Sequence, residues 1–101
     1  PCIEKYSDRP KPANVLVCID VLEHIEPECL DDVLDDMHGL SKKSVFLTIA
    51  TAEALKKLPD GRNAHLIVQD YKKWLSKLWE YFTMVNYSQR AYGFIFIGEP
   101  K

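Results

Sequence analysis

Two kinds of apolar pattern alternate along the chain and predict different elements. Short continuous apolar runs, rich in β-branched residues, occur at 15–19 and 45–49. Such runs are typical of strands that are buried on both faces of a parallel sheet. We therefore expect buried strands over 14–19 and 44–49, joined by a right-handed crossover.

The segment between these strands has a helical period. Its apolar positions recur at intervals of three and four residues, at Leu30, Val33, Leu34 and Met37. Pro27 suits the first turn of a helix, and Gly39 is expected to be its C-cap. The order strand, helix, strand predicts a β-α-β unit.

The rest of the chain predicts a long connection, a second helix and a hairpin. Over 52–69 we expect a helical turn at 52–58 and a tight turn at Asp60-Gly61. Asp70 is the expected N-cap of a helix whose apolar face includes Trp74, Leu78 and Phe82, and Trp79 is also expected to pack on the sheet. Strands at 84–87 and 94–97 around residues 89–91 predict a closing hairpin.

These elements predict the fold class. We expect a partial doubly wound, Rossmann-like α/β sheet, mostly parallel, with a C-terminal antiparallel hairpin. The opening stretch, through Pro12, holds three prolines among charges and predicts an irregular connection or a short edge strand.

Composition narrows the class of protein. A chain of 101 residues forms one domain at most, and 47% hydrophobic with 28% charged residues indicate a packed fold. The net charge of −2 does not support sequence-independent binding of nucleic acid, because the chain has no general basic surface. It does not exclude a contact with nucleic acid at one local site. Three cysteines without a C-x-x-C pair indicate a reducing compartment. With no apolar run of about 20 residues, we expect a cytoplasmic protein without a membrane span.

The segment after the first predicted strand carries a family resemblance. In CIDVLEHIEP, at 18–27, the strand runs into a D/E-x-x-E-H pattern, and SVFLTIAT, at 44–51, forms the next strand. This segment and the order of the elements resemble the later half of class I S-adenosylmethionine-dependent methyltransferases, from the fourth strand onward. The resemblance covers most of the chain.

The resemblance implies that part of the family's domain is missing from this chain. The family binds its cofactor mainly through a Gly-rich turn after the first strand and an acidic residue after the second, whereas the four glycines here are scattered. We therefore expect residues 1–101 to form a single partial domain that lacks the N-terminal cofactor-binding half. An isolated copy is expected to bind the cofactor poorly or not at all.

The resemblance also implies a function. The complete form would transfer a methyl group from S-adenosylmethionine to an oxygen or nitrogen acceptor, with Ile19, Asp20 and Val21 at the cofactor and Asp20 closest to the methyl group. Whether the acceptor is a small molecule or RNA stays open. The alternative is a non-catalytic binding or assembly module that keeps half of the fold.

Four potential metal ligands follow the two predicted strands: Asp20, Glu23, His24 and His65. Because adjacent parallel strands end at the same sheet edge, these side chains are expected to converge. Two carboxylates and two imidazoles suit Mg²⁺ or Mn²⁺, and an E-x-x-E-H cluster with a later histidine resembles a metal-dependent subset of the family. The alternative is a structural Glu-His pair without metal.

A polar cluster precedes His65. Asp60, Arg62 and Asn63 lie where the family usually touches substrate, and an arginine can pair with an anionic group. The equal alternative is turn chemistry, since Asp-Gly and Asn suit tight bends.

The resemblance implies that the first strand of the family's sheet is absent from this chain. The strand at 15–19, which is apolar and uncharged, is then expected to lie at an edge of the sheet. We expect this strand to pair with its own copy in a two-fold dimer, unless residues 1–13 cover the edge.

Overall fold

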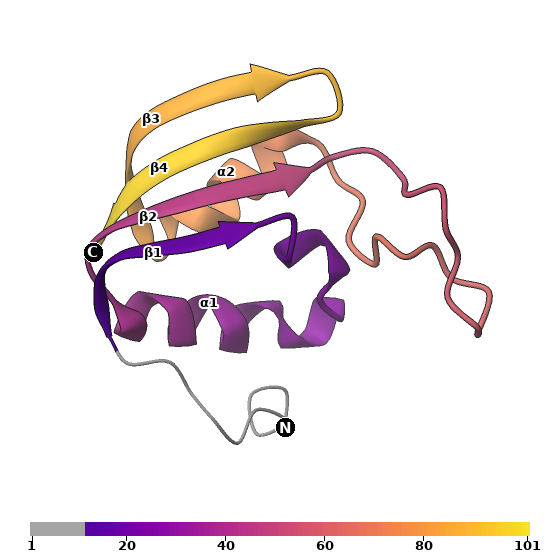
Figure 1. Ribbon diagram of the computed structural model, residues 1–101, viewed down its shortest axis with the longest axis horizontal. Coiled ribbons are helices and arrows are strands. Elements are labelled where there is room, and N and C mark those ends of the chain that lie inside the picture. Colours follow the sequence, from indigo (N-terminus) through magenta and orange to yellow (C-terminus); the bar gives the residue numbers. More distant parts are fainter. Residues whose placement is uncertain (1–11) are drawn as a thin grey trace.

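The computed structural model describes residues 12–101, which form a four-stranded sheet and two helices. Figure 1 shows the arrangement. The strands are β1 (Ala13–Ile19), β2 (Ser41–Ala50), β3 (Phe82–Arg90) and β4 (Gly93–Pro100), and the helices are α1 (Leu30–Leu40) and α2 (Tyr71–Trp79). The predicted irregular opening stretch lies almost wholly outside the described residues. None of the described helices is long and apolar enough to cross a bilayer.

The strand order is β1-β2-β4-β3, and the sheet is mixed. β1 and β2 are parallel, which confirms the β-α-β unit, while β2 with β4 and β4 with β3 are antiparallel. The expectation of a mostly parallel sheet is therefore wrong for residues 12–101. The reason is that the hairpin returns β4, not β3, to the side of β2.

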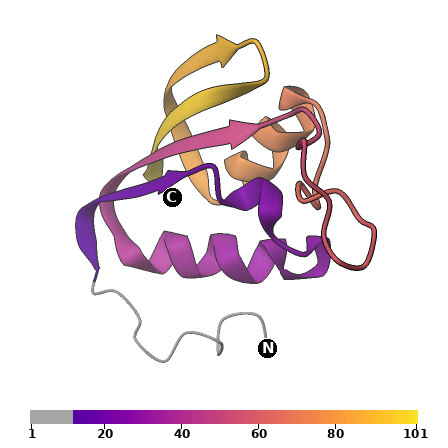
Figure 2. The same cartoon turned by 45° about the vertical axis from the view of Figure 1, so that its right-hand side comes forward.

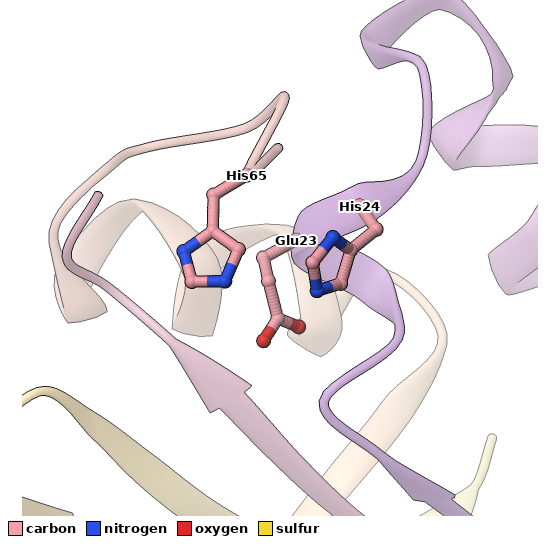
Figure 3. Close-up of side chains that lie close together, drawn as sticks. All are labelled: Glu23, His24 and His65. Carbon is pink, nitrogen blue, oxygen red and sulfur yellow. The ribbon is translucent and has the colours of Figure 1, made fainter. Parts of the chain in front are cut away.

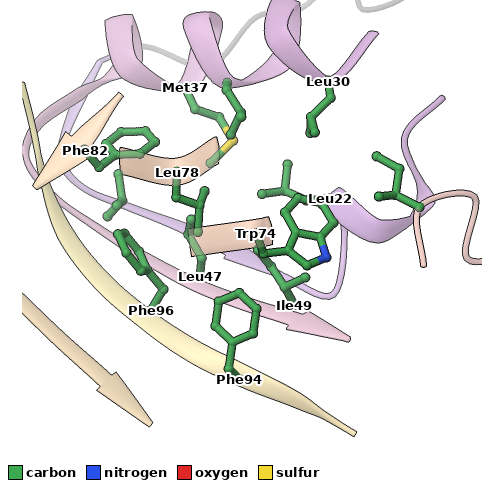
Figure 4. Close-up of a cluster of buried hydrophobic side chains, with 13 residues drawn as sticks. Leu22, Leu30, Met37, Leu47, Ile49, Trp74, Leu78, Phe82, Phe94 and Phe96 are labelled. Carbon is green, nitrogen blue, oxygen red and sulfur yellow. The ribbon is translucent and has the colours of Figure 1, made fainter. Parts of the chain in front are cut away.

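One face of the sheet carries the core (Figure 4). Val45, Leu47 and Ile49 on β2 are 0–1% exposed, and they alternate with half-buried residues of the opposite face. Against them pack Leu34 of α1 and Trp74 of α2, both fully buried. Burying side chains of this size contributes about 1.5–3 kcal/mol each, so both helices are fixed to this face.

β1 departs from the expected burial on both faces. Leu16 and Cys18 pack against the core, but Val15, Val17 and Ile19 are 53%, 57% and 56% exposed. The prediction was wrong because both described helices pack on the same face of the sheet, so no described element covers the face of β1 that carries these three residues.

The two helices begin as expected, but their ends differ. A 3-10 turn at Pro27–Cys29 leads into α1, and α1 runs past Gly39 to Leu40, so Gly39 is not its C-cap. Asp70 caps α2, and its side chain accepts a hydrogen bond from Lys73 N. α2 stops at Trp79, which places Phe82 in β3, and Trp79 is half exposed rather than packed on the sheet.

The hairpin forms as predicted, with longer strands and a turn at Ala91-Tyr92. Gly93 follows that turn at the carboxyl end of β2. A Cβ on Gly93 would lie 2.3 Å from Ile49 O, so only glycine permits this close approach.

The connection between β2 and α2 contains no helix (Figure 2). The expected helical turn at 52–58 is therefore wrong. The tight turn is present, since Gly61 has a φ of 91° and its N–H donates to Leu58 O over 2.9 Å.

Candidate functional site

A cleft of about 770 Å³ opens at the carboxyl ends of β1 and β2. Its lining includes the end of β1, the turn after it, the connection after β2 and the tip of the β3–β4 hairpin. In α/β sheets, ligands bind at this edge of parallel strands. The cleft is therefore the candidate site.

Glu23 forms part of the cleft wall and is fully buried. Its Oε2 accepts a hydrogen bond from Ala50 N over 3.1 Å, and its backbone oxygen accepts one from Ile67 N. These bonds fix Glu23 between the end of β2 and the connection. Its Oε1 is buried and has no hydrogen-bond partner among the described residues. A buried carboxylate oxygen without a partner is costly, so this atom is a candidate ligand for a cation.

Two histidines face Glu23 from different segments. Nδ1 of His24 lies 2.8 Å from Ala64 O, and Nδ1 of His65 lies 2.6 Å from Ala52 O. Because a carbonyl oxygen only accepts, each Nδ1 carries a proton and donates it, so in the neutral ring the lone pair is on Nε2. Figure 3 shows the Nε2 side of both rings directed toward the Glu23 carboxylate. Backbone carbonyls that hold the other ring nitrogen are the usual support for metal-binding histidines.

The predicted convergence of three residues is confirmed. Ligand atoms of Glu23, His24 and His65 lie within 4.8 Å of one another, and the two rings meet edge to face with centroids 4.7 Å apart. This geometry places one carboxylate and two imidazoles around one point.

Asp20 lines the same cleft but is not in that group. It has a left-handed backbone with φ of 53°, and its Oδ1 accepts a hydrogen bond from Thr48 Oγ1 over 3.0 Å. The Asp20 N–H in turn donates to Thr48 O. Non-glycine residues in this conformation cost of order 1–3 kcal/mol and concentrate at functional sites.

Glu23 also affects its surroundings electrostatically. Burial, assisted by the negative charge of Glu23, raises the pKa of the Cys18 thiol to about 11. Cys18 is thus an uncharged, partly buried side chain that packs against the core, and Glu23 has no cationic partner among its described hydrogen bonds.

The polar cluster before His65 holds the connection in shape. The Asn63 side chain accepts from Ala54 N and His65 N and donates to Ala54 O, over 2.8–2.9 Å. Arg62 donates through Nε to Asp60 and through both Nη atoms to Glu26. Hydrogen bonds to these carboxylates raise the pKa of Arg62 and lower that of Asp60.

Asp60, Arg62 and Asn63 therefore make contacts that hold the connection between β2 and α2 in place. Only His65 of this segment lines the cleft, and these three do not. Arg62 links the turn to Glu26, close in sequence to His24, so the cluster holds the two histidine-bearing segments together.

Sequence reasoning missed the opposite wall of the cleft. Arg90, Ala91 and Tyr92 belong to its lining, and they come from the hairpin tip. The one available signal was Gly93, since a glycine after a turn allows the backbone to approach a neighbouring strand.

Comparisons with known proteins bear on the fold. No protein-family model and no curated protein matches the sequence. Among solved structures, PH0226 protein from Pyrococcus horikoshii OT3 is similar with a TM-score of 0.68 and 15% identity, over 95% of this chain and 55% of that one. The N-methyltransferase NodS from Bradyrhizobium japonicum WM9, in complex with S-adenosyl-L-homocysteine, is similar with a TM-score of 0.59 and 14% identity, over 92% of this chain and 48% of that one.

These likenesses define the class of fold. The chain has an α/β fold of the methyltransferase kind, and it spans about half the length of the solved structures it matches.

Proposed function

We propose that the chain forms part of an S-adenosylmethionine-dependent methyltransferase acting on an oxygen or nitrogen acceptor. The observation that carries the proposal is the cleft at the carboxyl ends of β1 and β2, with left-handed Asp20 on its wall. It occurs in a fold shared with an N-methyltransferase that holds S-adenosyl-L-homocysteine.

Methyl transfer requires mainly that the protein positions the acceptor and the cofactor relative to each other. In methyl transfer the acceptor atom attacks the methyl carbon in line with the departing sulfur, and the acceptor loses a proton. Ile19, Asp20 and Val21 are all exposed at the end of β1, where they can contact the cofactor. Thr48 holds the Asp20 carboxylate in place, which suits a role beside the reacting methyl group.

We further propose that Glu23, His24 and His65 bind a divalent cation. The fit rests on the orphaned, buried Glu23 Oε1 and on the two free Nε2 atoms. Two imidazoles with a single carboxylate favour a borderline ion such as Mn²⁺ over Mg²⁺, which prefers oxygen ligands. When bound, such an ion would lower the proton affinity of an acceptor hydroxyl. Asp20, whose carboxylate is held by Thr48, lies outside this group and is proposed to contact the cofactor instead.

Binding of S-adenosyl-L-homocysteine tests the methyltransferase proposal. We expect the isolated chain to bind it weakly, because Ile19 and Asp20 line only one side of the cleft. Amide NMR spectra should therefore show shifts at Ile19, Asp20 and Val21 at millimolar ligand.

The matched variant is Asp20→Asn, because asparagine also tolerates the left-handed backbone but removes the charge. It should reduce these shifts, whereas Asp32→Asn, on the exposed face of α1, should leave them unchanged. Unperturbed spectra at millimolar ligand would contradict the proposed contact of Ile19, Asp20 and Val21 with the cofactor, and would favour a fragment that does not bind the cofactor by itself or a non-catalytic module.

Asn63→Ala tests whether the loop contacts position His65. The change removes three hydrogen bonds and should lower the free energy of unfolding by about 1–3 kcal/mol. Loss of such outer contacts typically weakens metal binding about 10–100-fold, so Mn²⁺ titration followed by calorimetry should show that loss. Asn86→Ala is the control, since Asn86 is exposed on β3 and its side chain accepts one local hydrogen bond, from Tyr87 N. Unchanged Mn²⁺ affinity in Asn63→Ala would refute the positioning role.

A further inference from the structure

The tip of the β3–β4 hairpin forms the rim of the cleft opposite the Glu23, His24 and His65 group. Tyr92 is 76% exposed there, although most large apolar side chains of the strands are covered. Arg90 is also exposed and lines the same cleft. An aromatic ring and a guanidinium thus border one cavity.

The backbone of this rim is held in place. Tyr92 O accepts a hydrogen bond from Thr51 N over 2.8 Å, and Gly93 lies against Ile49 O with no room for a side chain. Tyr92 is therefore set at a fixed distance from the end of β2 rather than on a free loop. Because the backbone is already held, only the side-chain torsions of Tyr92 must be ordered when a ligand stacks on its ring.

The guanidinium of Arg90 is available. Within residues 12–101 it forms no ion pair or hydrogen bond, whereas the guanidinium of Arg62 donates three hydrogen bonds to Glu26 and Asp60. Arginine pairs with carboxylate and phosphate groups through two parallel hydrogen bonds. Among the cleft residues Arg90 is the one permanent cation.

We infer that this rim is the binding subsite for the methyl acceptor, and that the acceptor is a planar ring bearing an anionic group. The inference rests on the proposed function. The ring would stack on Tyr92, the anion would pair with Arg90, and the nucleophilic oxygen or nitrogen would then face the floor of the cleft. Both a nucleotide phosphate and an aromatic carboxylate have this chemistry.

The test uses the whole chain and four probes, with binding measured by NMR titration. Adenosine 5′-monophosphate and 4-hydroxybenzoate carry the anion, and adenosine and phenol are their uncharged counterparts. We expect at least one anionic probe to bind about tenfold or more tightly than its counterpart and to shift the signals of Arg90 and Tyr92. If the nucleotide is the probe that binds, the anionic group of the acceptor is a phosphate, and if 4-hydroxybenzoate binds, it is a carboxylate.

Two variants separate the contributions. Arg90→Gln should remove the preference for the anion and leave the uncharged probe unaffected, and Tyr92→Ala should weaken both, with Tyr92→Phe close to the parent. Lys72→Gln and Trp79→Ala, which change exposed side chains of α2 outside the cleft, are the matched controls.

Parallel titrations with S-adenosyl-L-homocysteine keep the two proposals distinguishable. Probe binding at Arg90 and Tyr92 without any cofactor binding would support the subsite and contradict the proposed contact of Ile19, Asp20 and Val21 with the cofactor. Cofactor binding without probe binding, or displacement of the probe by S-adenosyl-L-homocysteine, would overturn the subsite.

Discussion

Mn²⁺ should raise the melting temperature of the protein, and His65→Ala should abolish that rise. A ligand that binds only the native state stabilises it by about 2.7 kcal/mol at a concentration of 100 times its Kd. For a domain of this size, such a gain corresponds to a rise of roughly 10–20 °C. Thermal unfolding followed by circular dichroism, with and without millimolar Mn²⁺, measures the effect.

Two further variants sharpen this experiment. His38→Ala is the matched control, because His38 lies in the last turn of α1 and bonds Lys101 O, outside the cleft. Glu23→Gln keeps an acceptor for Ala50 N but removes the buried charge. Without metal it should be at least as stable as the parent, since a buried carboxylate without a cationic partner is costly.

With metal, Glu23→Gln should lose most of the rise in melting temperature. A melting temperature that does not respond to millimolar Mn²⁺, or an equal response in His65→Ala, would refute the metal proposal.

The convergence of His24 with His65 was predictable from sequence for a topological reason. Both residues follow neighbouring parallel strands, and the ends of such strands share one sheet edge whatever the details of the loops. The buried runs that predicted β1 and β2 therefore also predicted where these side chains would meet. The periodicity of α2 was similarly informative, because Trp74 and Leu78 face the sheet at helical spacing.

The remaining features depend on contacts that no local pattern encodes. Asp20 was predicted to be a metal ligand, but a φ of 53° and a bond to Thr48, 28 positions away, hold its carboxylate apart from the group. The helical turn at 52–58 was wrong because the side chain of Asn63 bonds both backbone groups of Ala54. Arg90 and Tyr92 reach the cleft only because β4 lies beside β2.

The exposed edge of the sheet leads to an expectation about assembly. β1 pairs with β2 on one side, and among the described residues its other side has no strand partner. Its regular segment, Val15 to Ile19, contains no charge and no proline, features that discourage pairing between edges. The opposite edge, β3, has a register shift between Met84 and Asn86 that disrupts such pairing.

We propose that β1 pairs antiparallel with its own copy in a two-fold dimer, which would join the two sheets and place the exposed Val15, Val17 and Ile19 of both copies side by side. Light scattering at tens of micromolar protein should then give twice the mass of one chain.

Val17→Lys should shift the protein to monomer, because a charge at the centre of the paired strands opposes its symmetry copy across the axis. Val85→Lys is the matched control, since Val85 is 58% exposed on β3, compared with 57% for Val17 on β1, and should leave the mass unchanged. A monomer in the parent protein, or a mass that Val17→Lys does not alter, would show that something other than a second copy covers the β1 edge.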